Sequence, residues 1–178
     1  MLTLAPFTVA DIDRLIGWIP DATFLLQWAG PTLSWPLTRE QLERDIAAAK
    51  PGGSSLMFKA LTDASEAVGH IAIKAIDRVH RNAMLGRILI APDRRGQGLG
   101  QPLVHAALRV CFDDLGLHRV GLRVFAHNAS AIASYRRVGF VQEGFERHTK
   151  LAPDGTWWDA VTMAMLEPEW RAAQKSKA

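Results

Sequence analysis

The chain has 178 residues, of which 48% are hydrophobic and 22% are charged, and its formal net charge is +3. This balance is ordinary for a globular domain and excludes a disordered or strongly basic chain, so we expect no nucleic-acid partner. The single cysteine, Cys111, excludes an internal disulfide. No apolar run is long enough to span a bilayer and the first residues lack an export signal, so we expect a cytoplasmic protein with no membrane partner.

We expect one domain over residues 1–178, because this length is typical of a single core. The first half predicts a strand at 2–7 and a helix from Thr8 to about Ile19, with Thr8 and Asp11 as its capping pair. Residues 20–36 are rich in Trp, Pro and Gly and predict an irregular wall beside a cleft. A capping box at 38–41 begins a second helix that runs to about Lys50.

The second half alternates strands and helices. Short polar turns join strands at 56–62, 68–76 and 83–90, which indicates an antiparallel meander. An amphipathic helix from about Gly98 to Leu115 then leads to a buried strand at 118–125, which must run parallel to 83–90 because a helix connects the two. A helix at 130–138, strands at 140–146 and 156–166, and a partly helical tail from Glu167 complete an α/β chain.

The stretch from Ile88 to Gly100 carries the strongest functional signal. An apolar strand ends at Pro92, and Arg95-Gly96-Gln97-Gly98-Leu99-Gly100 opens the long helix. Glycine permits dihedral angles that are closed to other residues, so successive backbone N–H groups can converge beside the positive end of the helix. This predicts a site for a phosphate-sized anion. The run matches neither the Walker pattern nor the G-x-G-x-x-G pattern of dinucleotide-binding proteins.

A second motif lies downstream: Asn128, then a helix with Tyr135, the only tyrosine, then Gly139-Phe140. In this order and spacing the two motifs resemble the Gcn5-related N-acetyltransferase (GNAT) superfamily over roughly residues 56–166. The Trp-Trp-Asp strand at 157–159 and the Glu-Trp pair at 169–170 are most similar to the branch that includes the ribosomal-protein-alanine N-acetyltransferases.

The resemblance implies an α/β fold with a splayed, mostly antiparallel mixed sheet and flanking helices. Coenzyme A would enter the gap between the fourth and fifth strands. The implied activity is transfer of an acetyl group from acetyl-coenzyme A, a co-substrate, to the primary amine of a protein N-terminus or a small molecule. The implied motif core is 56–166, and 8–50 would supply the acceptor side.

The resemblance also assigns roles to residues. Tyr135 would hydrogen-bond the leaving thiolate or protonate it, and Asn128 would bond the pantetheine arm or cap its own helix. The acceptor would be bound by the stretch from Phe24 to Trp35, with Trp28 and Trp35 as its binding residues, together with the turns at 77–82 and 151–158. The coenzyme would be held by the backbone of Ile88, Leu89 and Ile90 and by the loop residues Arg95, Gly96, Gln97, Gly98, Leu99 and Gly100.

The general base stays open, because Leu122-Arg123-Val124 stands where the family often has a glutamate. The candidates are His70, His127, Asp21 and Asp159, or a chain of water molecules. The six histidines show no metal-ligand spacing, so no metal is expected.

Two other functions remain open: a non-catalytic acyl-coenzyme A sensor with the same fold, and a nucleotide-phosphate module that uses the glycine loop alone. A homodimer is also left open.

Overall fold

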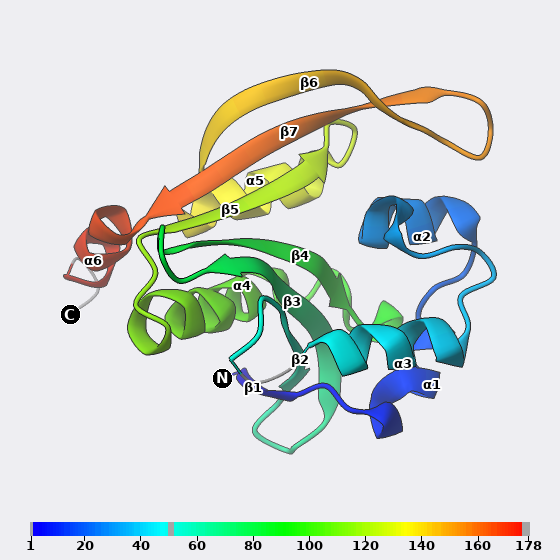
Figure 1. The fold of residues 1–178 in the computed structure, drawn as a ribbon, viewed down its shortest axis with the longest axis horizontal. Coiled ribbons are helices and arrows are strands. Elements are labelled where there is room, and N and C mark those ends of the chain that lie inside the picture. The colour runs from blue at the N-terminus through cyan, green and yellow to red at the C-terminus, as the bar shows by residue number, and fades with distance from the viewer. Residues whose placement is uncertain (1, 50–51, 176–178) are drawn as a thin grey trace.

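The computed structural model describes residues 2–49 and 52–175. Their strands form one seven-stranded sheet in the order β1-β2-β3-β4-β5-β7-β6 (Figure 1). Neighbouring strands are antiparallel except β4 and β5, which are parallel. The strands are β1 (Thr3–Pro6), β2 (Leu56–Leu61), β3 (Ala67–Asp77), β4 (Asn82–Ile90), β5 (Arg119–Phe125), β6 (Val141–Leu151) and β7 (Trp157–Leu166).

Helices flank this sheet, and the long β6–β7 hairpin projects beyond it toward α2 (Figure 1). Short 3₁₀ turns lie at Val9–Asp11, Gly30–Thr32 and Pro92–Arg94, and a π-helical turn at Val110–Asp114 extends α4. The α-helices are α1 (Ile12–Gly17), α2 (Ala22–Ala29), α3 (Arg39–Ala48), α4 (Gly100–Arg109), α5 (Ala129–Val138) and α6 (Glu167–Lys175).

Two hydrophobic cores lie on opposite faces of the sheet. Ile71 and Ile73 of β3 belong to the core under α4, whereas Ala72 between them belongs to the core under α1, α2 and α3. Successive side chains of a strand point to opposite faces, so each face of the sheet carries its own layer of helices. The coenzyme and acceptor regions expected from the sequence therefore lie on a sheet that is covered on both sides.

A bulge in β4 reverses which residues face which core. The pairs His70–Leu89 and Ala72–Gly86 place two steps of β3 against three steps of β4, so β4 carries one extra residue. Arg87 lies in the bulge with φ 51°, and beyond it Leu89 packs into the α1–α3 core rather than the α4 core. A β-bulge bends its strand and turns the following backbone, so the last residues of β4 take a new direction.

The parallel strands β4 and β5 part company after four pairs. Their register runs from Asn82–Arg119 to Leu85–Leu122 and stops there. The edge of β4 from Gly86 to Ile90 consequently has no strand partner on the side away from β3. This is the splayed sheet that the family resemblance implied, and the α/β class is confirmed.

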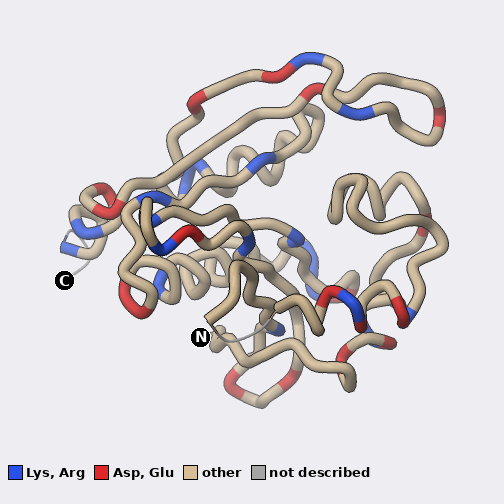
Figure 2. The backbone as a smooth tube through the Cα atoms, in the orientation of Figure 1, with Lys and Arg blue, Asp and Glu red and all other residues tan. Residues whose placement is uncertain are grey.

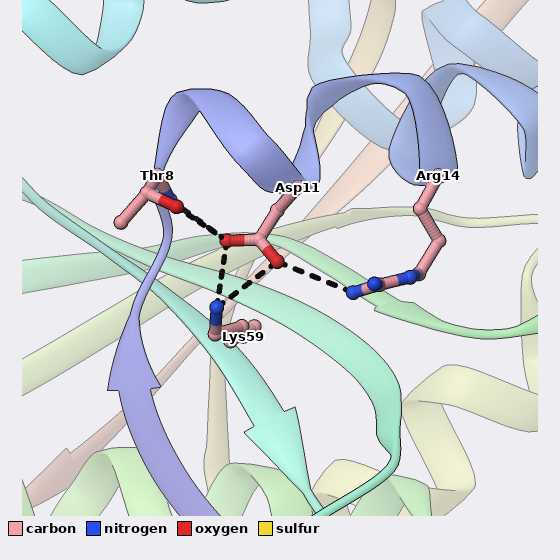
Figure 3. A network of polar contacts seen from close by, with 4 residues as sticks. All are labelled: Thr8, Asp11, Arg14 and Lys59. Atoms are coloured by element: carbon pink, nitrogen blue, oxygen red, sulfur yellow. Dashed lines mark hydrogen bonds and ion pairs between the residues drawn. The ribbon is translucent and has the colours of Figure 1, made fainter.

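A buried carboxylate fastens α1 to the sheet (Figure 3). The Nζ of Lys59, on β2, donates to both oxygens of Asp11 at 3.0 and 2.9 Å, while the backbone N–H and hydroxyl of Thr8 donate to Oδ2 at 3.0 and 2.9 Å. Arg14 adds a contact at 3.2 Å. Burial works against the charged carboxylate, but these donors outweigh it and hold the pKa of Asp11 below 3.8. The predicted capping pair thus also anchors the helix.

The prediction for residues 20–36 was wrong in one respect, because they contain α2. Asp21 caps this helix by accepting from the backbone N–H of Phe24 at 2.8 Å, and Leu25 and Trp28 bury one face. The long helix ends its regular α-helical part at Arg109. The predicted end of the second helix, Lys50, lies outside the described residues.

Acidic and basic residues are interspersed along the chain rather than gathered on one face (Figure 2). Within 2–49 and 52–175, no helix is long and apolar enough to cross a membrane.

Candidate active site

A cleft of about 440 Å³ opens where β4 and β5 separate. Its floor is the divergent strand ends, and its walls are the glycine loop, α5 and the near end of α2. Of the residues predicted for the site, the cleft is lined by Trp28, Ile88, Leu89, Ile90, Arg95, Gly96, Gly98, Leu99, Gly100, Asn128 and Tyr135. Most of the predicted coenzyme residues therefore lie around one cavity.

The glycine loop presents unpaired amides to this cleft. Gly96 and Gly98 both have φ +75°, and a Cβ added to either would have no atom within 4 Å. These glycines are required by backbone angle rather than by space. Within the described part of the chain, the N–H groups of residues 96–99 make no hydrogen bond. With the start of α4 they form a cradle for an anion.

Arg95 crosses the mouth of the cleft. Its Nε donates to the carbonyl of Ile90 at 3.1 Å, and its guanidinium lies 4.9 Å from the ring centre of Phe24 on α2. The neighbouring Arg94 is tied to Glu66 at 2.7 Å. Gln97 turns away from the cavity and donates to the carbonyl of Asp93 at 3.1 Å.

Tyr135 projects from α5 into the cleft. Its ring lies 6.1 Å from that of Phe140, and its hydroxyl makes no hydrogen bond to any described residue. Burial raises the pKa of Tyr135 to about 12. The hydroxyl is therefore a protonated, unengaged donor inside the cavity.

Asn128 caps α5 by accepting from the backbone N–H of Ala131 at 3.3 Å. The capping alternative is thus seen directly, and Asn128 also lines the cleft.

A second hollow, of about 310 Å³, lies beside the cleft and shares its floor. The two hollows meet over residues of α2, β4 and β5, namely Gln27, Trp28, Leu85, Gly86, Arg87, Arg123, Val124 and Phe125. The gap between β4 and β5 therefore connects a loop-lined cleft to a smaller chamber bounded by α2 and the β6–β7 hairpin.

The model of the family described as Acetyltransferase (GNAT) family matches residues 21–140, which contain the loop, the splayed strands and α5. The chain belongs to the GNAT acetyltransferase family.

Relatives of this GNAT protein act on different amines. A spermidine N(1)-acetyltransferase of Vibrio cholerae is 36% identical over 103 residues, 58% of each chain. An L-amino acid N-acetyltransferase of Escherichia coli is 28% identical over 137 residues, 76% of this chain and 82% of the other. The chain aligns with less than two thirds of the length of the first curated relatives.

The crystal structure of spermidine N-acetyltransferase from Vibrio cholerae in complex with CoA and spermine superposes with a TM-score of 0.84. It covers 95% of this chain and 97% of that one at 23% identity, so it shows a common fold. A putative ribosomal N-acetyltransferase of Bacillus subtilis is 30% identical over 102 residues, 57% of this chain and 55% of that one. The ribosomal-protein branch therefore stays a prediction.

The structure separates the two tryptophans predicted for the acceptor side of this GNAT protein. Trp28 is buried and lines both hollows. Trp35 is 48% exposed and lines neither hollow. The predicted turns at 77–82 and 151–158 also lie outside the second hollow.

None of the base candidates lines either hollow. Asp21 caps α2, Asp159 accepts from the backbone N–H of His148 at 2.7 Å, and His127 contacts Gln27 at 3.0 Å. His70 is buried, with Nδ1 bonded to the carbonyl of Arg87 at 2.9 Å, and burial lowers its pKa to about 4. It supports the β4 bulge instead of facing the cavity.

Several lining residues escaped the sequence analysis: Lys74, Arg87, Arg123, Ser134 and Lys150. Phe24 and Gln27 lie within the stretch 24–35 that was predicted to bind the acceptor, although they belong to a helix rather than to a loop. Lys74 and Lys150 gave no signal, because an alternating charged residue on a strand usually faces solvent. Among the described residues no group of His, Cys, Asp or Glu could hold a metal ion, and Cys111 is buried with its pKa raised by burial to about 12.

Proposed function

We propose that this GNAT protein transfers the acetyl group of acetyl-coenzyme A to a small primary amine. The observation that carries this proposal is a protonated, unpaired phenol and a row of unpaired loop amides around one cleft at the splayed strands. The loop would hold the pyrophosphate, and the free edge of β4 from Ile88 to Ile90 would bond the amides of the pantetheine arm.

In this reaction the amine nitrogen attacks the thioester carbonyl, a C–N bond forms and the C–S bond breaks. Holding both reactants in connected hollows removes much of the entropic cost of their meeting. The amine loses a proton, and the departing sulfur gains one. The backbone N–H of Ile90 would stabilise the oxyanion.

Tyr135 would act on the sulfur. Full proton transfer from a phenol of pKa about 12 to a thiolate of pKa about 8.5 is uphill by about 5 kcal/mol. A hydrogen bond to the developing thiolate needs no such transfer, and it is strengthened by the charge. We therefore assign Tyr135 as a hydrogen-bond donor to the leaving group, with the final proton coming from water.

The first test is ligand-dependent thermal stability. Acetyl-coenzyme A at a hundredfold excess over its Kd should stabilise the fold by about 2.7 kcal/mol, and ATP or NAD should not. Stabilisation by ATP alone would favour the nucleotide-phosphate module.

The second test is release of free thiol in the presence of a panel of primary amines. Thiol release that depends on the amine establishes transfer. Tight coenzyme binding without release for any amine would favour the acyl-coenzyme A sensor.

A further inference from the structure

The second hollow is electrostatically one-sided. Four basic side chains line it, those of Lys74, Arg87, Arg123 and Lys150. No aspartate or glutamate lines this hollow or the cleft joined to it. A cationic acceptor would therefore meet only like charges among the residues around it.

The two arginines are already neutralised from outside the hollow. Arg87 is paired with Asp45 on α3 and also donates to the hydroxyl of Thr32 at 3.2 Å. Arg123 is paired with Glu146 on β6. Neither Asp45 nor Glu146 lines the hollow, so each arginine is paired with a carboxylate outside it and contributes little net charge to the interior.

The two lysines have no such partner. Within 2–49 and 52–175, neither Lys74 nor Lys150 makes an ion pair or a hydrogen bond through its ammonium group. Lys74 is half-buried, and burial together with the charge of Arg87 lowers its pKa, although Asp45 acts in the opposite direction. An ammonium group that is partly desolvated beside another cation gains from an anion placed next to it.

The lysines approach from opposite sides of the gap. Lys74 lies on β3, and its aliphatic stem lies over Gly86, where an added Cβ would be 3.6 Å from its Cδ. Lys150 lies on β6, opposite Trp158 of β7. The walls between them are mainly apolar, with Met84, Leu85, Val124 and Phe125. The chamber thus combines a compact apolar space with two ammonium groups that form no ion pair, although Asp45 partly offsets the charge of Lys74.

We propose that the acceptor is a compact primary amine that carries an anionic group, a carboxylate or a phosphate, and that Lys74 and Lys150 bind this group. The inference rests on the proposed acetyl transfer and names its substrate class. Two unit charges about 4 Å apart interact by about 4 kcal/mol at an effective dielectric constant of about 20. The same lysines would attract an anionic amine and repel a polyamine, in contrast to the substrates named for the spermidine relatives.

The experiment compares amines with and without the anionic group, and each rate is referred to the concentration of the deprotonated amine, because the anionic group also raises the pKa of the amine. Initial rates are measured with leucine against leucinamide, with phosphoethanolamine against ethanolamine, and with spermidine. We expect kcat/KM to be at least tenfold higher for the anionic member of one pair, and lowest for spermidine. The pair that shows the larger preference identifies the bound group as a carboxylate or a phosphate. The proposal would be overturned if kcat/KM were equal or higher for both leucinamide and ethanolamine than for their anionic counterparts, or if spermidine matched the preferred anionic amine.

Variants locate the effect. Lys74→Met and Lys150→Gln should each lower kcat/KM for the anionic amine about tenfold, chiefly through KM, with little change for its neutral partner. Lys150→Glu should narrow or reverse the preference between leucine and spermidine. Lys175→Gln, at the exposed end of α6, is the matched control and should change neither value. Equal losses on both members of a pair would overturn anion binding by these lysines.

A binding measurement separates this inference from the reaction itself. With free coenzyme A present, the preferred anionic amine should raise Tm of the wild-type protein but not of the Lys74→Met/Lys150→Gln double variant. Amine-dependent thiol release without any preference for anionic amines would contradict the proposed substrate class but not the acetyl transfer. If the protein binds coenzyme A and an anionic amine, and the amine binding depends on the two lysines, but no turnover is seen, the proposed acetyl transfer is contradicted and the anion site is not.

Discussion

The phenol of Tyr135 stands alone in a partly desolvated cavity, and that isolation makes a definite kinetic prediction. Tyr135→Phe removes the donor and keeps the ring, so kcat should fall about a hundredfold while the Kd of coenzyme A changes little. Steady-state rates and thermal shifts measure the two quantities. A fall in coenzyme affinity with kcat unchanged would assign the hydroxyl to binding instead.

The high pKa of Tyr135 also fixes a pH dependence. Because the phenol keeps its proton until the pH approaches about 12, the rate should show no decline from its ionisation between pH 8 and about 10. The wild-type pH–rate profile is the measurement. A descending limb near pH 10 that disappears in Tyr135→Phe would contradict an elevated pKa.

His70 predicts how stability depends on acid. Burial lowers its pKa to about 4 from 6.5, so the unfolded chain binds the extra proton first. The contribution is fully present above pH 6.5 and is lost as the pH falls toward 4, by about 3 kcal/mol in total. Denaturant unfolding across this range should show the wild type losing stability relative to His70→Gln. A constant difference between the two proteins would contradict the assignment.

At the scale of a single element, the glycine loop and α1 offer a matched pair of substitutions. Gly98→Ala forces alanine to φ +75°, which should cost about 1–2 kcal/mol and weaken coenzyme A binding about tenfold. Gly17→Ala makes the same change at the end of α1, where the added Cβ meets nothing within 4 Å and φ is ordinary. It should be neutral or stabilising. Equal effects on coenzyme affinity would contradict a cradle built on backbone angle.

The anchor of α1 to β2 should be sensitive to its one carboxylate. Asp11→Asn leaves Lys59 without its buried counter-charge and should lower the free energy of unfolding by about 3 kcal/mol. Arg14 is 47% exposed on the same carboxylate, so Arg14→Ala should cost less than about 1 kcal/mol. Urea titrations of the two variants test this ranking, and a reversed order would contradict it.

Element by element, the sequence predicted most strands because alternation and short polar turns are local signals. It also predicted the parallel pair, since a helical crossover permits no other direction for two neighbouring strands. It could not predict the β4 bulge, because the extra residue is visible only against β3. Helix α2 was missed because Pro20, Gly30 and Pro31 outweighed the cap at Asp21.

The candidate site likewise contains some residues that the sequence predicted and others that it could not. Motif residues such as Gly98 and Tyr135 were predicted because their spacing along the chain is characteristic. Lys74 and Lys150 are 76 positions apart in the sequence and share a chamber only through the order of the strands, which no local pattern encodes. Trp35 shows the converse, because a large aromatic residue near a predicted cleft can still face solvent.

At the scale of the whole molecule, the coenzyme should act as the missing partner of β4. Only four parallel pairs join the β1–β4 half of the sheet to the β5–β7–β6 half. At a hundredfold excess over Kd, coenzyme A should slow exchange of the backbone amides in residues 86–90 that open locally at the free edge of β4 by up to about a hundredfold, and more than it slows exchange in β1. Hydrogen-exchange mass spectrometry measures this, with residues 3–6 of β1 as the internal reference. Protection confined to the glycine loop would contradict pairing along β4.

The two connected hollows have a kinetic consequence. Neither hollow is enclosed, and the two are lined by different elements away from their shared floor. Each reactant therefore has its own route to the gap between β4 and β5. The thioester and the nucleophile can then be resident together, and neither must depart before the other arrives. Double-reciprocal plots at several fixed concentrations of the second reactant should intersect, as a ternary-complex mechanism requires. Parallel lines would instead indicate that the acetyl group is first transferred to the protein and that the amine binds only after coenzyme A has left.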